Sequence, residues 1–230
     1  MRNRGDNELI QEISLAKERL HKKLLALDIG SLGITEYNQR YLGDKLENIG
    51  GQLDLYGYLL RLCLSNNSLS VQQSAFVDYG GGSGILSLLA KELGIAKVIY
   101  NDIYDGSCND VGILSNALGL PLDSIICGDV EDLISFVQGN SLTINSMASY
   151  DVLEHLYDVK DHFNKLASLQ EDYFRIVYAS GANIKNPRIV RYLQKQQVRA
   201  EHESREKMWG HKERDSLSAY YDMRKEIITS

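Results

Sequence analysis

A glycine-rich segment is the part of the sequence best suited to hold a ligand. Residues 80–84 read Gly-Gly-Gly-Ser-Gly, and they follow the apolar run 75–79. Glycine permits positive φ and lets a ligand approach the backbone closely. Loop amides at the start of a following helix also supply hydrogen-bond donors. The sequence therefore predicts a binding loop between a strand and a helix.

Two common nucleotide-binding patterns do not fit this loop. A dinucleotide fingerprint that starts at Gly80 needs a third glycine where the chain has Ile85. A phosphate-binding P-loop needs Gly-Lys followed by Ser or Thr, which is absent here. The pattern D-x-G-x-G-x-G does fit, with Asp78, Gly80, Gly82 and Gly84.

Two acids follow at the ends of apolar runs further along the chain. Asp102 closes the run 96–102, and Asp129 closes the run 124–129. A carboxylate in such a place can accept hydrogen bonds from both hydroxyls of a ribose. For either acid the alternative is a helix N-cap, where aspartate is favoured in any case.

The chain between residues 75 and 180 alternates short apolar runs with helical patterns. Strands are expected at 75–79, 96–102, 124–129, 141–149 and 172–180, and the intervening segments, including 84–93, 131–137 and 159–169, are expected to be helical. This alternation indicates an α/β fold, a doubly wound and mainly parallel sheet with helices on both faces. Ligands on such sheets bind at the carboxyl ends of the strands, at the topological switch point.

The segments on either side of this core are expected to be helical. Apolar residues recur at three- and four-residue steps within 6–64, and a long polar helix is predicted from Pro187 to about Met208, followed by another at 215–228. We therefore expect an N-terminal helical lid or cap (1–70), a core (71–183) and a C-terminal helical segment (184–230). No sixth or seventh strand is evident, so we expect a truncated chain, because an open sheet edge invites aggregation.

The loop and the spaced acids together resemble the motifs of class I S-adenosylmethionine-dependent methyltransferases. Residues 78–84 resemble their motif I, residues 127–133 their motif III, and 146–158 the D-V-L-E-H segment of the ubiquinone-biosynthesis type. The resemblance covers about residues 76–180. It implies a Rossmann-like methyltransferase fold, S-adenosyl-L-methionine as cofactor, and methyl transfer to an acceptor.

The resemblance also implies which residues hold the cofactor. Asp102 would take the ribose and Asp129 the adenine amine, with Val130 beside the ring. On the helix before the first strand, Arg40 would meet the methionine carboxylate and Tyr37 would close over it, the alternative being an exposed amphipathic helix. The predicted cofactor-binding residues are Asp78, Tyr79, Gly80, Gly81, Gly82, Ser83, Gly84, Asp102, Ile103, Asp129, Val130, Tyr150, Tyr37 and Arg40.

His155 is the candidate catalytic residue. Positioning can supply much of the rate of methyl transfer, and a general base is needed only for a hydroxyl or a protonated amine. An imidazole titrates near neutral pH, although a structural role is the alternative. Small-RNA terminal methyltransferases hold a metal with Glu-x-x-Glu-His; here Asp151 replaces the first Glu, and His202 or His211 would be the distant ligand. Because that pattern is incomplete, we predict no metal, and metal-assisted RNA 2′-O-methylation remains an alternative.

Composition narrows the possible partners. The net charge of −6 gives no broad attraction for nucleic acid. The resemblance around the D-V-L-E-H segment implies a small-molecule acceptor, such as a sugar or lipid intermediate. The three cysteines show no metal-like spacing and suit a reducing cytoplasm. No apolar run is long enough for a membrane span. Trp209 lines the acceptor pocket or anchors a helix. A non-catalytic binding module is the alternative from another functional class.

Overall fold

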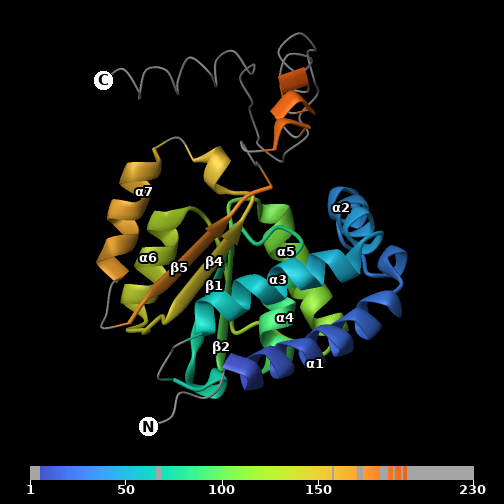
Figure 1. The fold of residues 1–230 in the computed structure, drawn as a ribbon, viewed down its shortest axis with the longest axis horizontal. Helices are drawn as coiled ribbons and strands as arrows, with labels where there is room; N and C mark the ends of the chain where they lie inside the picture. The colour runs from blue at the N-terminus through green and yellow to red at the C-terminus, as the bar shows by residue number, and fades with distance from the viewer. Residues whose placement is uncertain are drawn as a thin grey trace.

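The computed structural model describes residues 6–65, 69–156, 158–169, 173–181, 186–188, 190–192 and 194–195 (Figure 1). Its strands are β1 (Ala75–Tyr79), β2 (Lys97–Asp102), β3 (Ser124–Cys127), β4 (Ser146–Tyr150) and β5 (Arg175–Ala179). Its α-helices are α1 (Asp6–Leu25), α2 (Glu36–Leu46), α3 (Ile49–Leu64), α4 (Ile85–Leu93), α5 (Asp105–Ala117), α6 (Val130–Gly139) and α7 (Val159–Leu166). Short 3₁₀ helices are η1 (Ile29–Ser31), η2 (Val71–Gln73), η3 (Leu153–His155) and η4 (Ala167–Leu169).

The five strands form one parallel sheet in the order β3-β2-β1-β4-β5. The chain moves outward from β1 to β3 and then returns to the other side of β1 with β4. The topological switch point therefore lies between β1 and β4, next to the glycine-rich loop. The prediction of a doubly wound, Rossmann-like α/β fold is confirmed.

The fourth strand is shorter than the sequence indicated. Its expected start at residue 141 was wrong, because Ser141 has a φ of 51°, a left-handed conformation that does not continue a strand. The amide of Leu142 donates instead to the carbonyl of Val137 and closes the end of α6. Regular pairing with β1 begins only at Ser146, which lies opposite Phe76.

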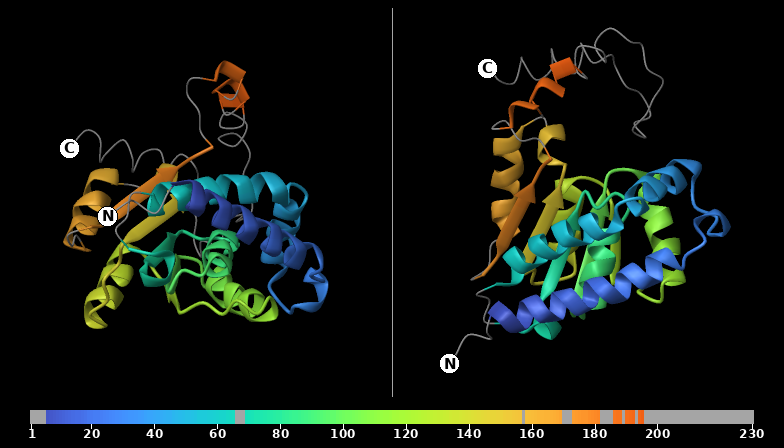
Figure 2. Two further views of the ribbon diagram at one scale, coloured as in Figure 1. Left: turned by 60° about the horizontal axis from the view of Figure 1, so that its bottom comes forward. Right: turned by 45° about the vertical axis from the view of Figure 1, so that its right-hand side comes forward.

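Alternating side chains along β1 serve the two faces of the sheet. Phe76 packs into the core formed with α3 and α4, and Val77 and Tyr79 pack into a second core with α6 and α7. The views in Figure 2 show helices on both sides of the sheet. Asp78 points to the same side as Phe76, toward the beginning of α4.

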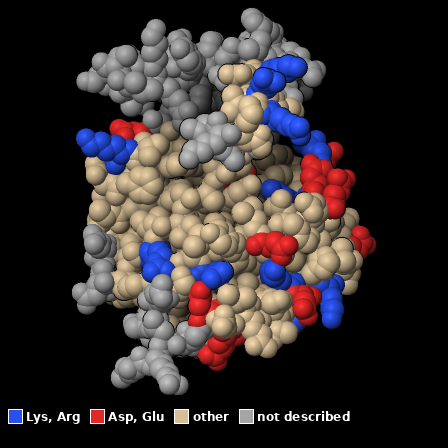
Figure 3. Space-filling model, viewed as in Figure 1, with Lys and Arg blue, Asp and Glu red and all other residues tan. Residues whose placement is uncertain are grey.

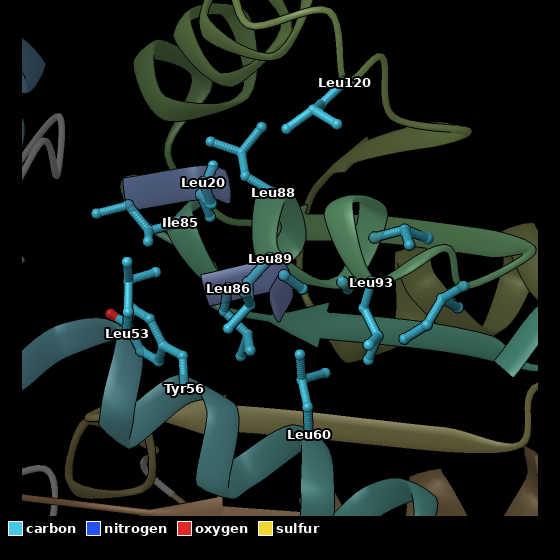
Figure 4. Close-up of a cluster of buried hydrophobic side chains, with 14 of the residues drawn as sticks. Leu20, Leu53, Tyr56, Leu60, Ile85, Leu86, Leu88, Leu89, Leu93 and Leu120 are labelled. Atoms are coloured by element: carbon cyan, nitrogen blue, oxygen red, sulfur yellow. The ribbon is translucent and has the colours of Figure 1, made fainter. Parts of the chain in front are cut away.

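The N-terminal helices share their hydrophobic core with the sheet. The buried stripe of α1 runs through Leu9, Ile13, Ala16, Leu20 and Leu24. Figure 4 shows side chains of α3 and α4 meeting in this core, and burial of each such leucine contributes about 1.5–3 kcal/mol. Ion pairs join α1 to its neighbours, since Arg19 pairs with Glu92 of α4 and Lys17 with Asp54 of α3. Figure 3 shows charged residues of both signs on this part of the surface. Thus α1 and α3 cover a face of the sheet, and α2 is the N-terminal helix that lies against the glycine-rich loop.

β5 forms one edge of the sheet in the part of the chain that is described, and all five of its residues are half-buried. Residues 187–188, 190–192 and 194–195 are helical, as expected after Pro187. The remainder of the predicted C-terminal helices, with His202, Trp209 and His211, lies outside the described residues. Within those residues, no helix combines the length and the apolar character that crossing a bilayer requires.

Candidate functional site at the carboxyl ends of the strands

The glycine-rich loop is a tight turn between β1 and α4 that other residues could not form. Gly80, Gly82 and Gly84 have φ values of 66°, 51° and 74°, which disfavour any residue with a Cβ. A Cβ at Gly80 would lie 2.3 Å from Cγ2 of Val152, and one at Gly84 would lie 2.3 Å from Cγ2 of Val111. Conformation therefore favours glycine at all three positions, and lack of space also requires it at Gly80 and Gly84.

Asp102 lies directly against this loop. Its Oδ2 accepts a hydrogen bond of 2.8 Å from the amide of Gly82, and its Oδ1 accepts one of 2.9 Å from the amide of Tyr104. The hydroxyl of Tyr100 donates to the carbonyl of Gly82 at 2.7 Å. Burial raises the pKa of the Asp102 carboxyl, whereas these amide donors lower it. The acid and the loop form one hydrogen-bonded unit.

Asp78 joins the end of β1, just before the loop, to helix α4, just after it. Its side chain is 2% exposed, and Oδ2 accepts hydrogen bonds from the amide and the hydroxyl of Ser87 at 2.9 and 2.8 Å. Burial raises the pKa of this carboxyl to about 7. Sequence reasoning missed Ser87, although a lone hydroxyl within the apolar run 85–90 was a visible signal. The pair fixes the end of β1 to the first turn of α4.

Asp129 has a different role from Asp102. Its Oδ1 accepts hydrogen bonds from the amides of Glu131 and Asp132 at 2.7 and 3.4 Å, and the amide of Asp129 donates in turn to Oδ2 of Asp132 at 3.0 Å. This is a capping box at the start of α6. The structure therefore shows the helix-cap alternative for this acid, and its contact with adenine stays a prediction.

Two predicted cofactor residues point their side chains into the core beneath α6 and α7. Tyr79 packs against His162, with ring centroids 5.1 Å apart, and Val130 is buried in the same cluster. Nε2 of His162 lies 2.5 Å from the hydroxyl of Tyr178. By contrast, Ile103 is 58% exposed beside Asp102, where an apolar side chain can pack against a bound ring.

Helix α2 brings a row of aromatic residues to the strand ends. A Cβ at Gly82 would lie 3.4 Å from Cε1 of Tyr41, so this ring lies against the loop. Tyr37 stacks with Tyr41 at a centroid distance of 6.1 Å and meets Tyr104 edge-on at 5.5 Å. Tyr41 and Tyr104 were not predicted. The four-residue spacing of positions 37, 41 and 45 on a helix was the signal that could have found Tyr41.

A buried polar network anchors the start of α2 to α5. Oδ2 of Asp110 accepts hydrogen bonds from the amide and hydroxyl of Thr35, at 3.0 and 2.5 Å, and from Nδ2 of Asn38 at 2.7 Å. A small cavity beside this network is lined in part by Gly82 and Ser83. This anchoring fixes the position of α2 relative to the glycine-rich loop.

The end of β4 contributes a second group of polar and aromatic residues. Tyr150 is half-buried and meets Tyr56 edge-on at 6.0 Å. Asp151 has a φ of 56°, and its Oδ1 accepts a hydrogen bond of 2.6 Å from the amide of Gly181. A left-handed residue other than glycine costs energy and is enriched at functional sites. His155 is exposed in η3, and Arg40 is exposed on α2.

Metal ligands do not gather in the described part of the chain. Among its residues, no group of three or more His, Cys, Asp and Glu side chains could hold a metal ion. The two distant histidines considered for the RNA methyltransferase alternative, His202 and His211, are outside that part of the chain.

The fold and the site define a Rossmann-like α/β protein with a glycine-rich loop at its switch point. No protein-family model and no curated protein sequence matches the chain. Among solved structures, the chain is similar to the crystal structure of Thermoplasma acidophilum 1320, with 14% sequence identity and a TM-score of 0.42, over 83% of this chain and 81% of that one. The functional conclusion therefore depends on the geometry of the site.

Proposed function

We propose that this chain binds S-adenosyl-L-methionine at the ends of β1 and β2 and transfers its methyl group to an acceptor near the end of β4. One observation carries the proposal, the 2.8 Å hydrogen bond between the Gly82 amide and the Asp102 carboxylate. It brings together a loop that a ligand can approach closely and an acid suited to a ribose.

The residues present fit such a nucleoside. Asp102 would accept hydrogen bonds from the ribose hydroxyls, and the exposed side chain of Ile103 would pack against the adenine. Tyr37 and Tyr41 on α2 border the same space. When bound, the cofactor supplies a methyl group already activated on a sulfonium, so that the protein has mainly to orient the two reactants.

The end of β4 is the proposed acceptor side. Tyr150, Asp151 and His155 follow one another there, and His155 is proposed to take a proton when the acceptor needs to lose one. The acceptor is proposed to be a small molecule, and the cytoplasm is the proposed location.

Two comparisons test the proposal: the binding of S-adenosylhomocysteine against that of NAD, and the effects of substituting two exposed isoleucines. Calorimetry is expected to show that S-adenosylhomocysteine binds and that NAD does not. Ile103→Ala should weaken S-adenosylhomocysteine binding about fivefold, because roughly 1 kcal/mol of apolar contact is lost. Ile113→Ala is the matched control, since Ile113 is also exposed (39%) but lies on α5. Binding of NAD without S-adenosylhomocysteine would overturn the proposal, and so would equal effects of the two substitutions.

A further inference from the structure

Two cysteines from different elements meet at the carboxyl ends of β2 and β3. Sγ of Cys108, on α5, lies 3.4 Å from the carbonyl oxygen of Asp102 and 3.8 Å from that of Ile126. Ile126 immediately precedes Cys127, which lies opposite Asp102 in the register of the two strands. The Cys127 thiol in turn donates to Oδ1 of Asp105, in the first turn of α5, at 3.0 Å. Each thiol therefore lies beside the element that carries the other.

The packing of α5 on β3 turns the two cysteines toward each other. A Cβ at Gly112 would lie 3.4 Å from Cδ1 of Ile125, so this side of the helix meets this side of the strand. Cys108 is one helical turn before Gly112, about 6 Å along the same side of α5. Cys127 is two residues after Ile125, about 7 Å along the same side of β3. Because α5 joins two parallel strands, it runs back against β3, and these similar steps bring Cys108 opposite Cys127.

The two thiols differ in their access to solvent. Cys127 is exposed, whereas Cys108 is only 7% exposed. Burial raises the pKa of both thiols, and a hydrogen bond between them raises that of Cys108 further. A reduced pair without stabilised thiolates forms a disulfide that is harder to reduce. The third cysteine, Cys63, is buried in a different hydrophobic cluster, where its thiol donates to the carbonyl of Met147.

We propose that Cys108 and Cys127 form a reversible disulfide, a redox-responsive modification site that joins α5 to β3. The inference does not rest on the proposed function, because it involves no nucleoside. In a reducing compartment, cysteine pairs of this kind are oxidised transiently and act in redox sensing or catalysis. Because Cys108 also contacts the carbonyl of Asp102, the disulfide adjoins the acid that lies against the glycine-rich loop.

The proposed oxidant is a small disulfide such as glutathione disulfide. The exposed Cys127 loses its proton to solvent and attacks one sulfur of the oxidant, so that a mixed disulfide forms and one glutathione thiolate leaves. Cys108 then loses its proton to solvent, attacks Sγ of Cys127 and releases the second glutathione thiolate. The two thiolates take up the two protons. Two electrons thus pass from the cysteine pair to glutathione disulfide, and two molecules of glutathione reverse the reaction.

The first experiment follows oxidation by intact mass and peptide mapping. The full chain is treated with glutathione disulfide, and the remaining thiols are blocked with N-ethylmaleimide in denaturant. We expect wild type to lose two hydrogen atoms, with Cys108 and Cys127 in one disulfide-linked peptide pair and Cys63 alkylated as the internal control. Cys127→Ser should abolish the bond and keep the fold, because a hydroxyl can still donate to Asp105. Cys108→Ser should accumulate the mixed disulfide on Cys127 at least tenfold above wild type.

A second experiment distinguishes an internal disulfide from an adduct. The ratio of oxidised to reduced glutathione is held constant while total glutathione is lowered tenfold. The ratio of oxidised to reduced wild type should then rise tenfold, because an internal disulfide releases two glutathione molecules for each one of glutathione disulfide consumed. A mixed disulfide releases only one, so its ratio would not change. This experiment needs no variant and decides the question even if Cys108→Ser fails to fold. A wild-type chain that ends as a stable glutathione adduct, as a disulfide-linked dimer or in its reduced form overturns the proposal.

Discussion

Asp102 and Asp129 end neighbouring parallel strands, yet the structure uses them differently. Asp102 lies beside Cys127 in the register of β2 and β3, so the two acids come to the same edge of the sheet. Asp102 accepts hydrogen bonds from the amides of Gly82 and Tyr104 and is partly buried, whereas Asp129 caps α6 and is exposed. From the sequence, both acids were interpreted as ligand-binding residues at strand ends, with a helix N-cap as the alternative for each.

The position of the following helix explains the difference. α6 begins at Val130, immediately after Asp129, so this carboxylate is itself at the N-cap position. α5 begins three residues after Asp102, with Tyr104 at its N-cap, which leaves the Asp102 side chain available to the glycine-rich loop. A strand-end acid can therefore serve a ligand when a short spacer separates it from the helix, and it tends to cap the helix when no spacer is present.

The largest expected effect comes from extending this comparison to Asp78, the most buried of the three acids. Its carboxyl has a folded pKa of about 7, against an ordinary value of 3.8. Between these values folding takes up a proton, so stability falls as pH rises from about 4 to 7, by up to about 1.4 kcal/mol per pH unit. Below this window both states are protonated, and above it both are ionised.

Asp78→Asn should flatten this pH dependence. We expect the variant to gain stability relative to wild type as pH rises through the window, as measured by urea unfolding at several pH values. Asp129→Asn is the control, since it removes one charge from an exposed acid and retains a good N-cap. A pH profile of Asp78→Asn that parallels wild type would show that the buried acid is not the group that titrates.

The second prediction separates Asp102 from Asp129 by ligand binding. Asp102→Asn should weaken S-adenosylhomocysteine binding at least tenfold, about 1.4 kcal/mol, because the ribose loses a charged acceptor. Asp129→Asn should change the affinity less than threefold, because the capping geometry persists and the adenine amine retains a carbonyl acceptor. Equal losses in the two variants, measured by calorimetry, would contradict the distinction drawn from the structure.

Much of the fold could be predicted from the sequence because its signals are local. Apolar runs between helical patterns indicated all five strands, and the stripe from Leu9 to Leu24 indicated α1. The errors lie at element boundaries, as at Ser141, where a left-handed residue in a polar turn replaces the expected start of β4. Backbone conformation at a single residue is not encoded by periodicity.

The site was predictable where it depends on glycine and on strand-end acids, and less so where it depends on packing. The contact between Gly82 and Asp102 follows from their places at adjacent strand ends. The network of Thr35 and Asn38 around Asp110 does not, because it depends on how α2 packs against α5. Pairings between residues about 70 positions apart leave no pattern in one sequence.

The smallest expected effect is the loss of stability when the helix cap at Asp129 is removed. Asp129→Ala removes the acceptor for the amides of Glu131 and Asp132 and should lower the free energy of unfolding by about 1 kcal/mol. Asp129→Ser should recover most of this loss, because a hydroxyl caps a helix nearly as well. Asp102→Ala tests the other acid of the comparison. Because the amide of Gly82 lies at a partly exposed site and can bind water instead, this substitution should lower the free energy of unfolding by less than Asp129→Ala does. If Asp102→Ala destabilises the fold more than Asp129→Ala does, Asp102 is primarily a structural acid, and its hydrogen bond to Gly82 no longer supports a ligand site.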